Sequence, residues 1–220
     1  MLRFGPATGP VVVVALPLFE EANRTRAFAV TILRALAGRG IAGALPDLPG
    51  QGESLVPTHE TTITKMREGF EGAVNHLARP AFALGIRSGA LLDTLALVQG
   101  RWHLSPMSGA DLLRELVRTR QASARESGET FDPSTLGTDP AAPPVELAGN
   151  LVSHQLLSEL SGVSPMTGVA RTVRIETEAK PADAKLPGSP LWRRAEPDND
   201  ETFAQVVADD IAQWIATCAG

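Results

Sequence analysis

The chain has 220 residues and a formal net charge of −5, and 43% of its residues are hydrophobic against 20% charged. This balance is ordinary for a soluble globular protein, and the length suffices for one well-buried domain or for one domain with a small lid. An acidic chain without a strong basic cluster is not expected to bind nucleic acid, because phosphate backbones attract basic surfaces. The only cysteine, Cys218, excludes an intramolecular disulfide and a cysteine-rich metal site.

Targeting and cofactor signals are missing from the sequence. No apolar run approaches the roughly 18 residues of a membrane-spanning helix, and the first residues lack the pattern of a signal peptide, so we expect a cytoplasmic protein. The histidines have no metal-ligand spacing, and neither short glycine-rich stretch follows a strand and opens a helix as a phosphate loop does. We therefore predict neither a metal nor a cofactor. The oligomeric state is left open.

Strands and helices are predicted to alternate along the first half of the chain. The β-branched run at 11–16 favours a strand buried on both faces, and the apolar stripe within 61–78 favours a helix. Strand, helix, strand, helix at this spacing implies right-handed crossovers and a parallel sheet with helices on both faces. We expect strands at residues 2–4, 11–16, 41–45, 81–84 and 101–104, and helices at residues 22–39 and 61–78.

The alternation pauses after Pro106. A helix is predicted over 108–118, a long polar loop over 121–144 and a short helix over 150–160, and we take 107–166 as a lid over the carboxyl ends of the strands. The sheet then resumes, with strands expected at residues 169–176 and 191–194 and a final helix at residues 201–218. The predicted fold is therefore α/β: an α/β-hydrolase-like three-layer sandwich with a mostly parallel sheet of about six strands. Its core would comprise residues 1–106 and 167–220, and a helical lid would be inserted between them.

The stretch at 80–92, PAFALGIRSGALL, organises this prediction. A buried strand that runs through a sharp turn into a helix starting near Ser88 is the layout of the nucleophile elbow of α/β-hydrolases, whose pattern is Gly-x-Ser-x-Gly. Gly85 and Gly89 stand at the flanking positions, but Arg87 occupies the central one. A guanidinium stays protonated and has no lone pair to offer, so Arg87 cannot serve as an acyl nucleophile.

Polar candidates follow other predicted strands, where open α/β sheets bind their ligands. Glu21 and Asn23 belong either to a capped, salt-bridged helix start or to a polar floor that pairs with Arg87. Asp47 lies in the loop after the second core strand, where a carboxylate more often fixes the loop than acts as an acid.

Two weak catalytic candidates remain. Ser88 stands one position after the elbow centre and is either a substitute nucleophile or a helix cap. His154 could reach the site from the lid as a base. No histidine follows position 154, so the loop after the last strand cannot supply the base of a Ser, acid, His triad.

Three segments together resemble the second type of hydrolase associated with the exosortase A system. They are PLFEEANRTR at 17–26, LPDLPGQGES at 45–54 and GIRSGALL at 85–92, and the resemblance includes arginine inside the elbow. Weaker similarities lie at 102–109, 146–157 and 190–192. The resemblance implies a bacterial hydrolase-like protein linked to surface polysaccharide and protein sorting, without establishing a reaction.

Three functional hypotheses follow. The first is a protein without the usual Ser/His triad that binds a small anionic or acyl ligand in a lidded pocket between Glu21, Asn23, Arg87 and Ser88, with Asp47 nearby. The second is an ester or thioester hydrolase with a rearranged site. The third is a non-catalytic interaction module, in which the lid and the loop at 121–144 dock a protein partner.

Overall fold

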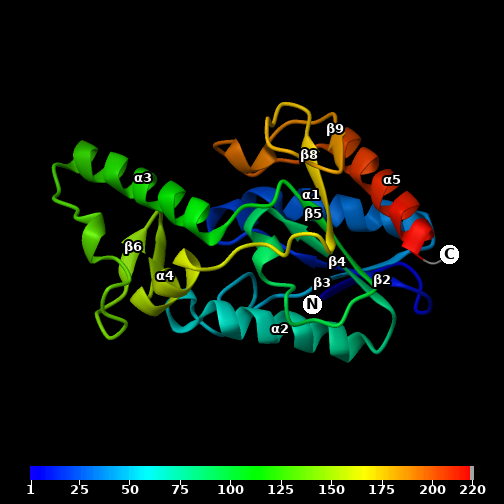
Figure 1. The fold of residues 1–220 in the computed structure, drawn as a ribbon, viewed down its shortest axis with the longest axis horizontal. Helices are drawn as coiled ribbons and strands as arrows, with labels where there is room; N and C mark the ends of the chain where they lie inside the picture. Colours follow the sequence, from blue (N-terminus) through cyan, green and yellow to red (C-terminus); the bar gives the residue numbers. More distant parts are fainter. Residues whose placement is uncertain (219–220) are drawn as a thin grey trace.

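The computed structural model describes residues 1–218 and has a seven-stranded sheet between two layers of helices (Figure 1). The strand order is β1-β3-β2-β4-β5-β8-β9, and every neighbouring pair is parallel except β1 with β3. The strands of this sheet are β1 (Leu2–Phe4), β2 (Val11–Ala15), β3 (Ala42–Leu45), β4 (Ala81–Ile86), β5 (Gly100–Leu104), β8 (Ala170–Ile175) and β9 (Ala184–Leu186). The predicted fold class is confirmed.

The helices divide between the two faces of the sheet. Helices α1 (Glu20–Gly38) and α5 (Glu201–Cys218) pack together on one face, and α2 (Ile63–Leu77) covers the other (Figure 1). All residues of β2 and β4 are buried, because helices cover both of their faces. No helix within residues 1–218 is long and apolar enough to cross a membrane.

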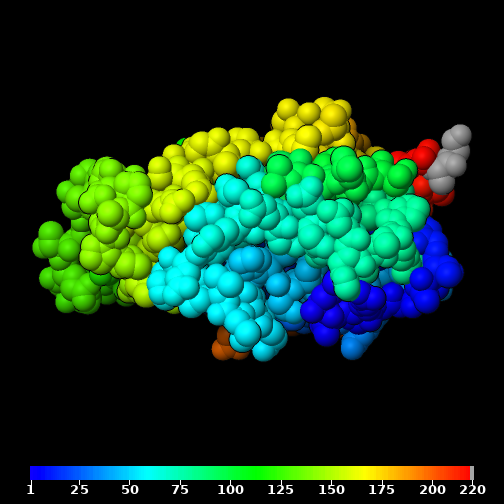
Figure 2. Space-filling model, turned by 90° about the horizontal axis from the view of Figure 1, so that it is seen from below, coloured from blue at the N-terminus to red at the C-terminus, as the bar shows by residue number. Residues whose placement is uncertain are grey.

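The segment between β5 and β8 forms one end of the molecule, shown in green to yellow in Figures 1 and 2. It consists of α3 (Gly109–Ser127), the antiparallel hairpin of β6 (Val145–Leu147) and β7 (Asn150–Val152), and α4 (His154–Ser161). Helix α3 extends into the region expected to be a loop and ends at Gly128, whose φ of 72° provides a left-handed cap. The hairpin was not predicted. Three-residue strands are too short to show an alternating pattern.

Two predicted elements are wrong. The elbow is followed by a short 3-10 helix, η2 (Arg87–Leu91), and by irregular chain up to β5, where a longer helix was expected. In this irregular stretch the Arg101 guanidinium binds the carbonyls of Asp93 and Ala96. A tertiary contact thus accompanies the irregular chain found where the helix was expected, and Leu97 there is 87% exposed.

The second error concerns the last strand. Residues Leu191–Arg193 form a 3-10 helix, η4, and the sheet ends with β9. Leu191 and Trp192 are both buried, whereas an edge strand alternates buried and exposed positions. Pro190, at the position that caps η4, cannot donate a ladder hydrogen bond. The remaining short 3-10 helices are η1 (Thr58–Glu60) and η3 (Pro133–Thr135).

The close approach at the elbow gives a stability prediction. A Cβ on Gly89 would collide with the carbonyl oxygens of Ala15 and Leu16, which are backbone atoms that cannot swing away. We expect Gly89→Ala to lower the free energy of unfolding by about 2 kcal/mol or more in urea denaturation. Gly72→Ala, in an exposed part of α2 with no atom near the new methyl group, should raise it by about 1 kcal/mol. Equal effects of the two substitutions would contradict the close approach.

Candidate functional site

The turn after β4 places Arg87 at the carboxyl end of a central strand. Its φ of 54° lies in the left-handed region, which costs a side-chain-bearing residue on the order of 1–3 kcal/mol. A Cβ on Gly85 would lie 2.7 Å from the Cα of Ala90, so this flanking position also needs glycine. The Gly-x-Arg-x-Gly pattern therefore forms a strained, closely packed turn.

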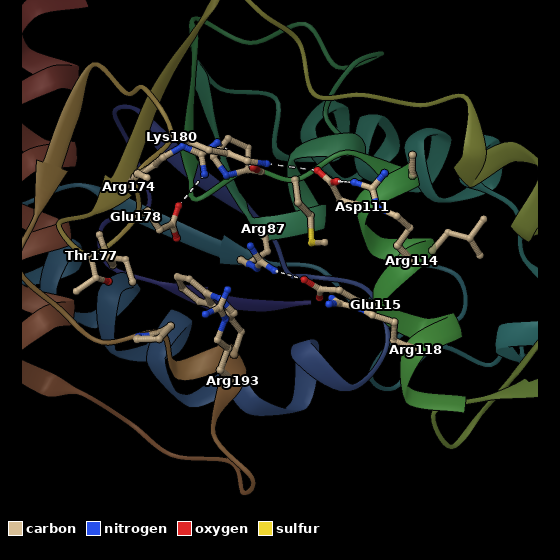
Figure 3. A pocket seen from close by; sticks show the side chains of 18 of the residues that line it. Arg87, Asp111, Arg114, Glu115, Arg118, Arg174, Thr177, Glu178, Lys180 and Arg193 are labelled. Atoms are coloured by element: carbon tan, nitrogen blue, oxygen red, sulfur yellow. Dashed lines mark hydrogen bonds and ion pairs between the residues drawn. The ribbon is translucent and has the colours of Figure 1, made fainter. Parts of the chain in front are cut away.

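The guanidinium of Arg87 lies between two carboxylates and an indole ring. Its Nη2 and Nε lie 3.2 and 3.3 Å from the two carboxylate oxygens of Glu21, which makes a forked ion pair. Glu115 of α3 lies on the other side, with Oε1 3.6 Å from Nη2 (Figure 3). The Arg87 Cζ also lies 5.0 Å from the ring centroid of Trp192. Arg87 is thus held from three directions and is only 7% exposed.

Burial changes the proton affinity of Glu21. Loss of water around the carboxylate raises the pKa of Glu21 above its ordinary value, and the negative charge of Glu115 raises it further. The charge and hydrogen bonds of Arg87 lower the pKa of Glu21, but they do not fully offset burial. One guanidinium therefore serves two carboxylates, of which Glu21 is the more deeply buried.

A cavity of about 960 Å³ opens beside Arg87, between α3, the loop after β8 and η4 (Figure 3). Its apolar wall includes Met107, Leu113, Val117, Ile175 and Trp192. Its charged lining has three acidic residues, Asp111, Glu115 and Glu178, and six basic ones, Arg87, Arg114, Arg118, Arg174, Lys180 and Arg193. The cavity is therefore amphipathic and has an excess of positive charge in an acidic protein.

The structure brings only part of the predicted site together. Glu21 pairs with Arg87, whereas Asn23 is exposed and lines a separate depression beside residues 50–58. The carboxylate of Asp47 pairs with Arg26 and with the amino group of Met1, and it accepts a hydrogen bond from the Glu53 N–H. Nδ1 of His154 accepts a hydrogen bond from the Gly137 N–H, inside the inserted segment.

One buried pair was missed by sequence reasoning, which placed His103 simply within a strand. His103 Nε2 lies 2.8 Å from Asp93 Oδ2, and neither side chain is exposed. Both are absent from the lining of the cavity beside Arg87. Asp93 lies in the irregular chain after the elbow, and His103 lies ten positions later on β5. No helical or strand periodicity links residues at this separation, so the sequence did not indicate the pair.

Comparison with solved structures identifies the fold. Est1E from Butyrivibrio proteoclasticus, solved with ferulic acid, superposes with a TM-score of 0.61 at 14% identity, covering 99% of this chain and 94% of that one. Mouse alpha/beta hydrolase domain-containing protein 10 gives 0.60 at 15% identity over 98% and 93% of the chains. A thermophilic esterase from Thermogutta terrifontis gives 0.51 at 17% identity over 99% and 92%.

The chain has the α/β-hydrolase fold. Identities this low show the fold alone. No protein-family model matches the sequence, and no curated protein sequence matches it significantly.

The elbow residues can be compared with the oxyanion hole of the α/β-hydrolase fold. Its oxyanion hole uses the N–H of the residue after the nucleophile and an N–H from the loop before the first helix. Here Ser88 follows Arg87, and the Leu18 N–H, in the loop before α1, donates a 2.9 Å hydrogen bond to Ser88 Oγ. Ser88 is fully buried. The Leu18 N–H is a backbone donor of the kind that an oxyanion needs, and it is already hydrogen-bonded to the Ser88 hydroxyl.

The fold also locates the usual acid and base, in the loops after the later strands. After β8, Glu178 forms a 2.7 Å ion pair with Arg174, and after β9 comes Trp192, which lies over Arg87. The chain after β9 thus brings the Trp192 ring over the Arg87 guanidinium at the end of β4.

Replacing the Ser88 hydroxyl tests whether it is structural. We expect Ser88→Ala to leave the buried Leu18 N–H without a partner and to lower the free energy of unfolding by about 1–3 kcal/mol. Ser164→Ala, at an exposed position in the loop before β8, is a control that should change it by less than about 0.5 kcal/mol. Urea denaturation measures both. Unchanged stability of Ser88→Ala would contradict this role.

The pKa of Glu21 predicts a pH dependence of stability. Because the folded protein binds this proton more tightly than the unfolded chain, protonated Glu21 favours folding at low pH. That contribution is lost as pH rises through the folded-state pKa. We therefore expect the difference in unfolding free energy, wild type minus Glu21→Gln, to decrease as pH increases from about 4 to about 7.

Asp47 provides the control of opposite sign. Burial alone would raise the pKa of Asp47, but hydrogen bonds from the Met1 amino group, the Glu53 N–H and Arg26 lower it overall. The contribution of Asp47 to stability is present at neutral pH and is lost as pH falls. The difference in unfolding free energy, wild type minus Asp47→Asn, should therefore increase with pH. Slopes of the same sign for the two variants would contradict the raised pKa of Glu21.

Proposed function

We propose that the cavity beside Arg87 binds an amphipathic organic anion and that the elbow does not carry out acyl transfer. The single observation that carries the proposal is the position of Arg87, at the centre of the elbow and next to a large amphipathic cavity. A guanidinium there cannot attack an acyl carbon.

The surroundings of Arg87 support binding without turnover. The sequence has no histidine after position 154, and Trp192 lies over the guanidinium. The Leu18 N–H already has a partner in Ser88. A nucleophile, a base and a free oxyanion donor are the parts that acyl transfer requires, and these contacts argue against all three.

The cavity supports the choice of ligand. About 960 Å³ is at the upper end of the range for small-molecule sites, and its wall joins apolar side chains to an excess of cations. An acyl chain would lie against Leu113, Val117 and Trp192, and a carboxylate or similar group would be attracted to the arginines. A structural neighbour, Est1E, was solved with ferulic acid, an aromatic carboxylate, which makes ferulate a reasonable second probe.

The inserted segment would act as a lid in this proposal. We place the lid at residues 107–166 and the hydrolase-like core at 1–106 and 167–220. Support comes from α3, whose residues line the cavity and whose Glu115 reaches Arg87. The sequence resemblance to exosortase A-associated hydrolases supports a role beside such a system in the bacterial cytoplasm.

Ligand binding and turnover can be measured separately. We expect dodecanoate to bind saturably in isothermal titration calorimetry, and we expect Val117→Trp, which fills the cavity from α3, to weaken it at least tenfold. Val169→Trp, at an exposed position outside the cavity, is the matched control and should bind as the wild type does.

The same preparations should not hydrolyse p-nitrophenyl butanoate above the uncatalysed rate. Hydrolysis that disappears in Ser88→Ala, while the variant remains folded by circular dichroism, would overturn the non-catalytic assignment. Absence of binding by dodecanoate, ferulate and dodecyl phosphate alike would overturn the ligand class.

A further inference from the structure

A second cavity, of about 860 Å³, lies on the other side of the Arg87 ion pairs. It is lined by the start of α1, by α3 and by η4, and its apolar wall includes Leu18, Phe19, Leu112, Leu116 and Ala122. Four residues line both cavities: Glu115 and Arg118 from α3, and Trp192 and Arg193 from η4. The two cavities therefore meet at a junction between the inserted segment and the core.

Two arginines at this junction differ from the other cations around them. Four of the six cations in the first cavity pair with carboxylates: Arg87 with Glu21 and Glu115, Arg174 with Glu178, and Arg114 and Lys180 with Asp111. Within residues 1–218, neither Arg118 nor Arg193 has a carboxylate within 4.0 Å, and the side chain of neither makes a hydrogen bond. Their charge is therefore available to a ligand (Figure 3).

The charge distribution locates the anionic group along the ligand. Beyond the junction, the second cavity carries Glu20 and Glu21, which would repel an anion, and one cation, Arg24, whose Nη1 already donates to the Trp192 carbonyl. In the first cavity, the cations other than Arg118 and Arg193 are already paired. The junction is thus the position where an added anion gains most, with apolar wall available on both sides of it.

The number of donors favours one kind of anion. A carboxylate has two oxygens, which one forked guanidinium satisfies, whereas a phosphate presents more oxygens and up to two charges. Arg118 and Arg193 approach from different elements and together offer two charges and two forks. We infer that the ligand is an elongated amphiphile whose phosphate group lies between Arg118 and Arg193 and whose apolar part extends into the two cavities.

This inference rests on the proposed binding function and makes Glu115 a specificity residue. Its carboxylate faces the same junction. Its 3.6 Å ion-pair distance to Arg87 is longer than the 3.2 Å distance between Arg87 and Glu21. A phosphate group would be repelled by Glu115 more than a singly charged carboxylate would. Removing this charge should therefore favour phosphate ligands selectively.

The test compares dodecyl phosphate with dodecanoate by calorimetry below their micelle concentrations. We expect the phosphate to bind at least tenfold more tightly to the wild type. Arg118→Gln and Arg193→Gln should each remove most of that preference, and Glu115→Gln should increase it. Arg125→Gln is the matched control, because Arg125 is exposed on α3 and lines neither cavity. The exposed positions of Arg118 and Arg193 make these variants compatible with folding.

The second cavity is tested by two neighbouring small residues of α3. Ala122 lines this cavity and Ser123 does not, and both are exposed. Ala122→Trp should weaken the binding of hexadecyl phosphate at least tenfold, whereas Ser123→Trp should leave it unchanged. Equal binding by the two variants would contradict the extension of the apolar part into the second cavity.

The outcomes separate the two proposals. Saturable dodecanoate binding with no preference for the phosphate would overturn the inference and leave the proposed function standing. A phosphate preference that survives both arginine substitutions would overturn the assigned junction. If dodecanoate, ferulate and dodecyl phosphate all fail to bind, the proposed function itself is overturned.

Discussion

The buried ion pair between Arg87 and Glu21 is the interaction on which the rest of this structure depends. It joins the end of the central strand β4 to the first turn of α1. Its arginine, Arg87, has a backbone φ in the strained left-handed region. A buried charge is expensive without a partner, so removing either residue would leave the other uncompensated. Glu115 then links the same guanidinium to α3. The inserted segment is thereby connected to the elbow by charge.

Charge pairing also shapes the cavities. Lys180, in the loop after β8, reaches Asp111 of α3, and Arg174 of β8 reaches Glu178. These contacts neutralise most of the cations that face the first cavity. The two arginines left unpaired among residues 1–218 of this lining, Arg118 and Arg193, lie where the cavities meet. A preference for anions would then come from a small number of unneutralised side chains within an acidic protein.

Sequence reasoning predicted the parts of the site that depend on local pattern. Glycines at positions 85 and 89 indicated the sharp turn, and Arg87 at its centre argued against an acyl nucleophile. One of the two open interpretations of Glu21 placed it against Arg87, as the structure does. The contacts of Ser88 with Leu18 and of Asp93 with His103 join residues from different elements. Their geometry depends on how those elements pack, which a pattern along the chain does not encode.

The sequence by itself determined the parallel sheet, its covering helices and the turn with arginine at its centre. Those features depend on apolar periodicity and on the spacing of glycines, which act over a few neighbouring residues. Tertiary structure alone decided that η2 and irregular chain stand where a helix was expected, with the carbonyls of Asp93 and Ala96 bound by Arg101. It also decided which cations of the cavity lining are paired, since Arg118 and Arg193 are separated by most of the inserted segment and two strands. Ion pairing depends on distances between atoms, and only the folded chain sets those distances.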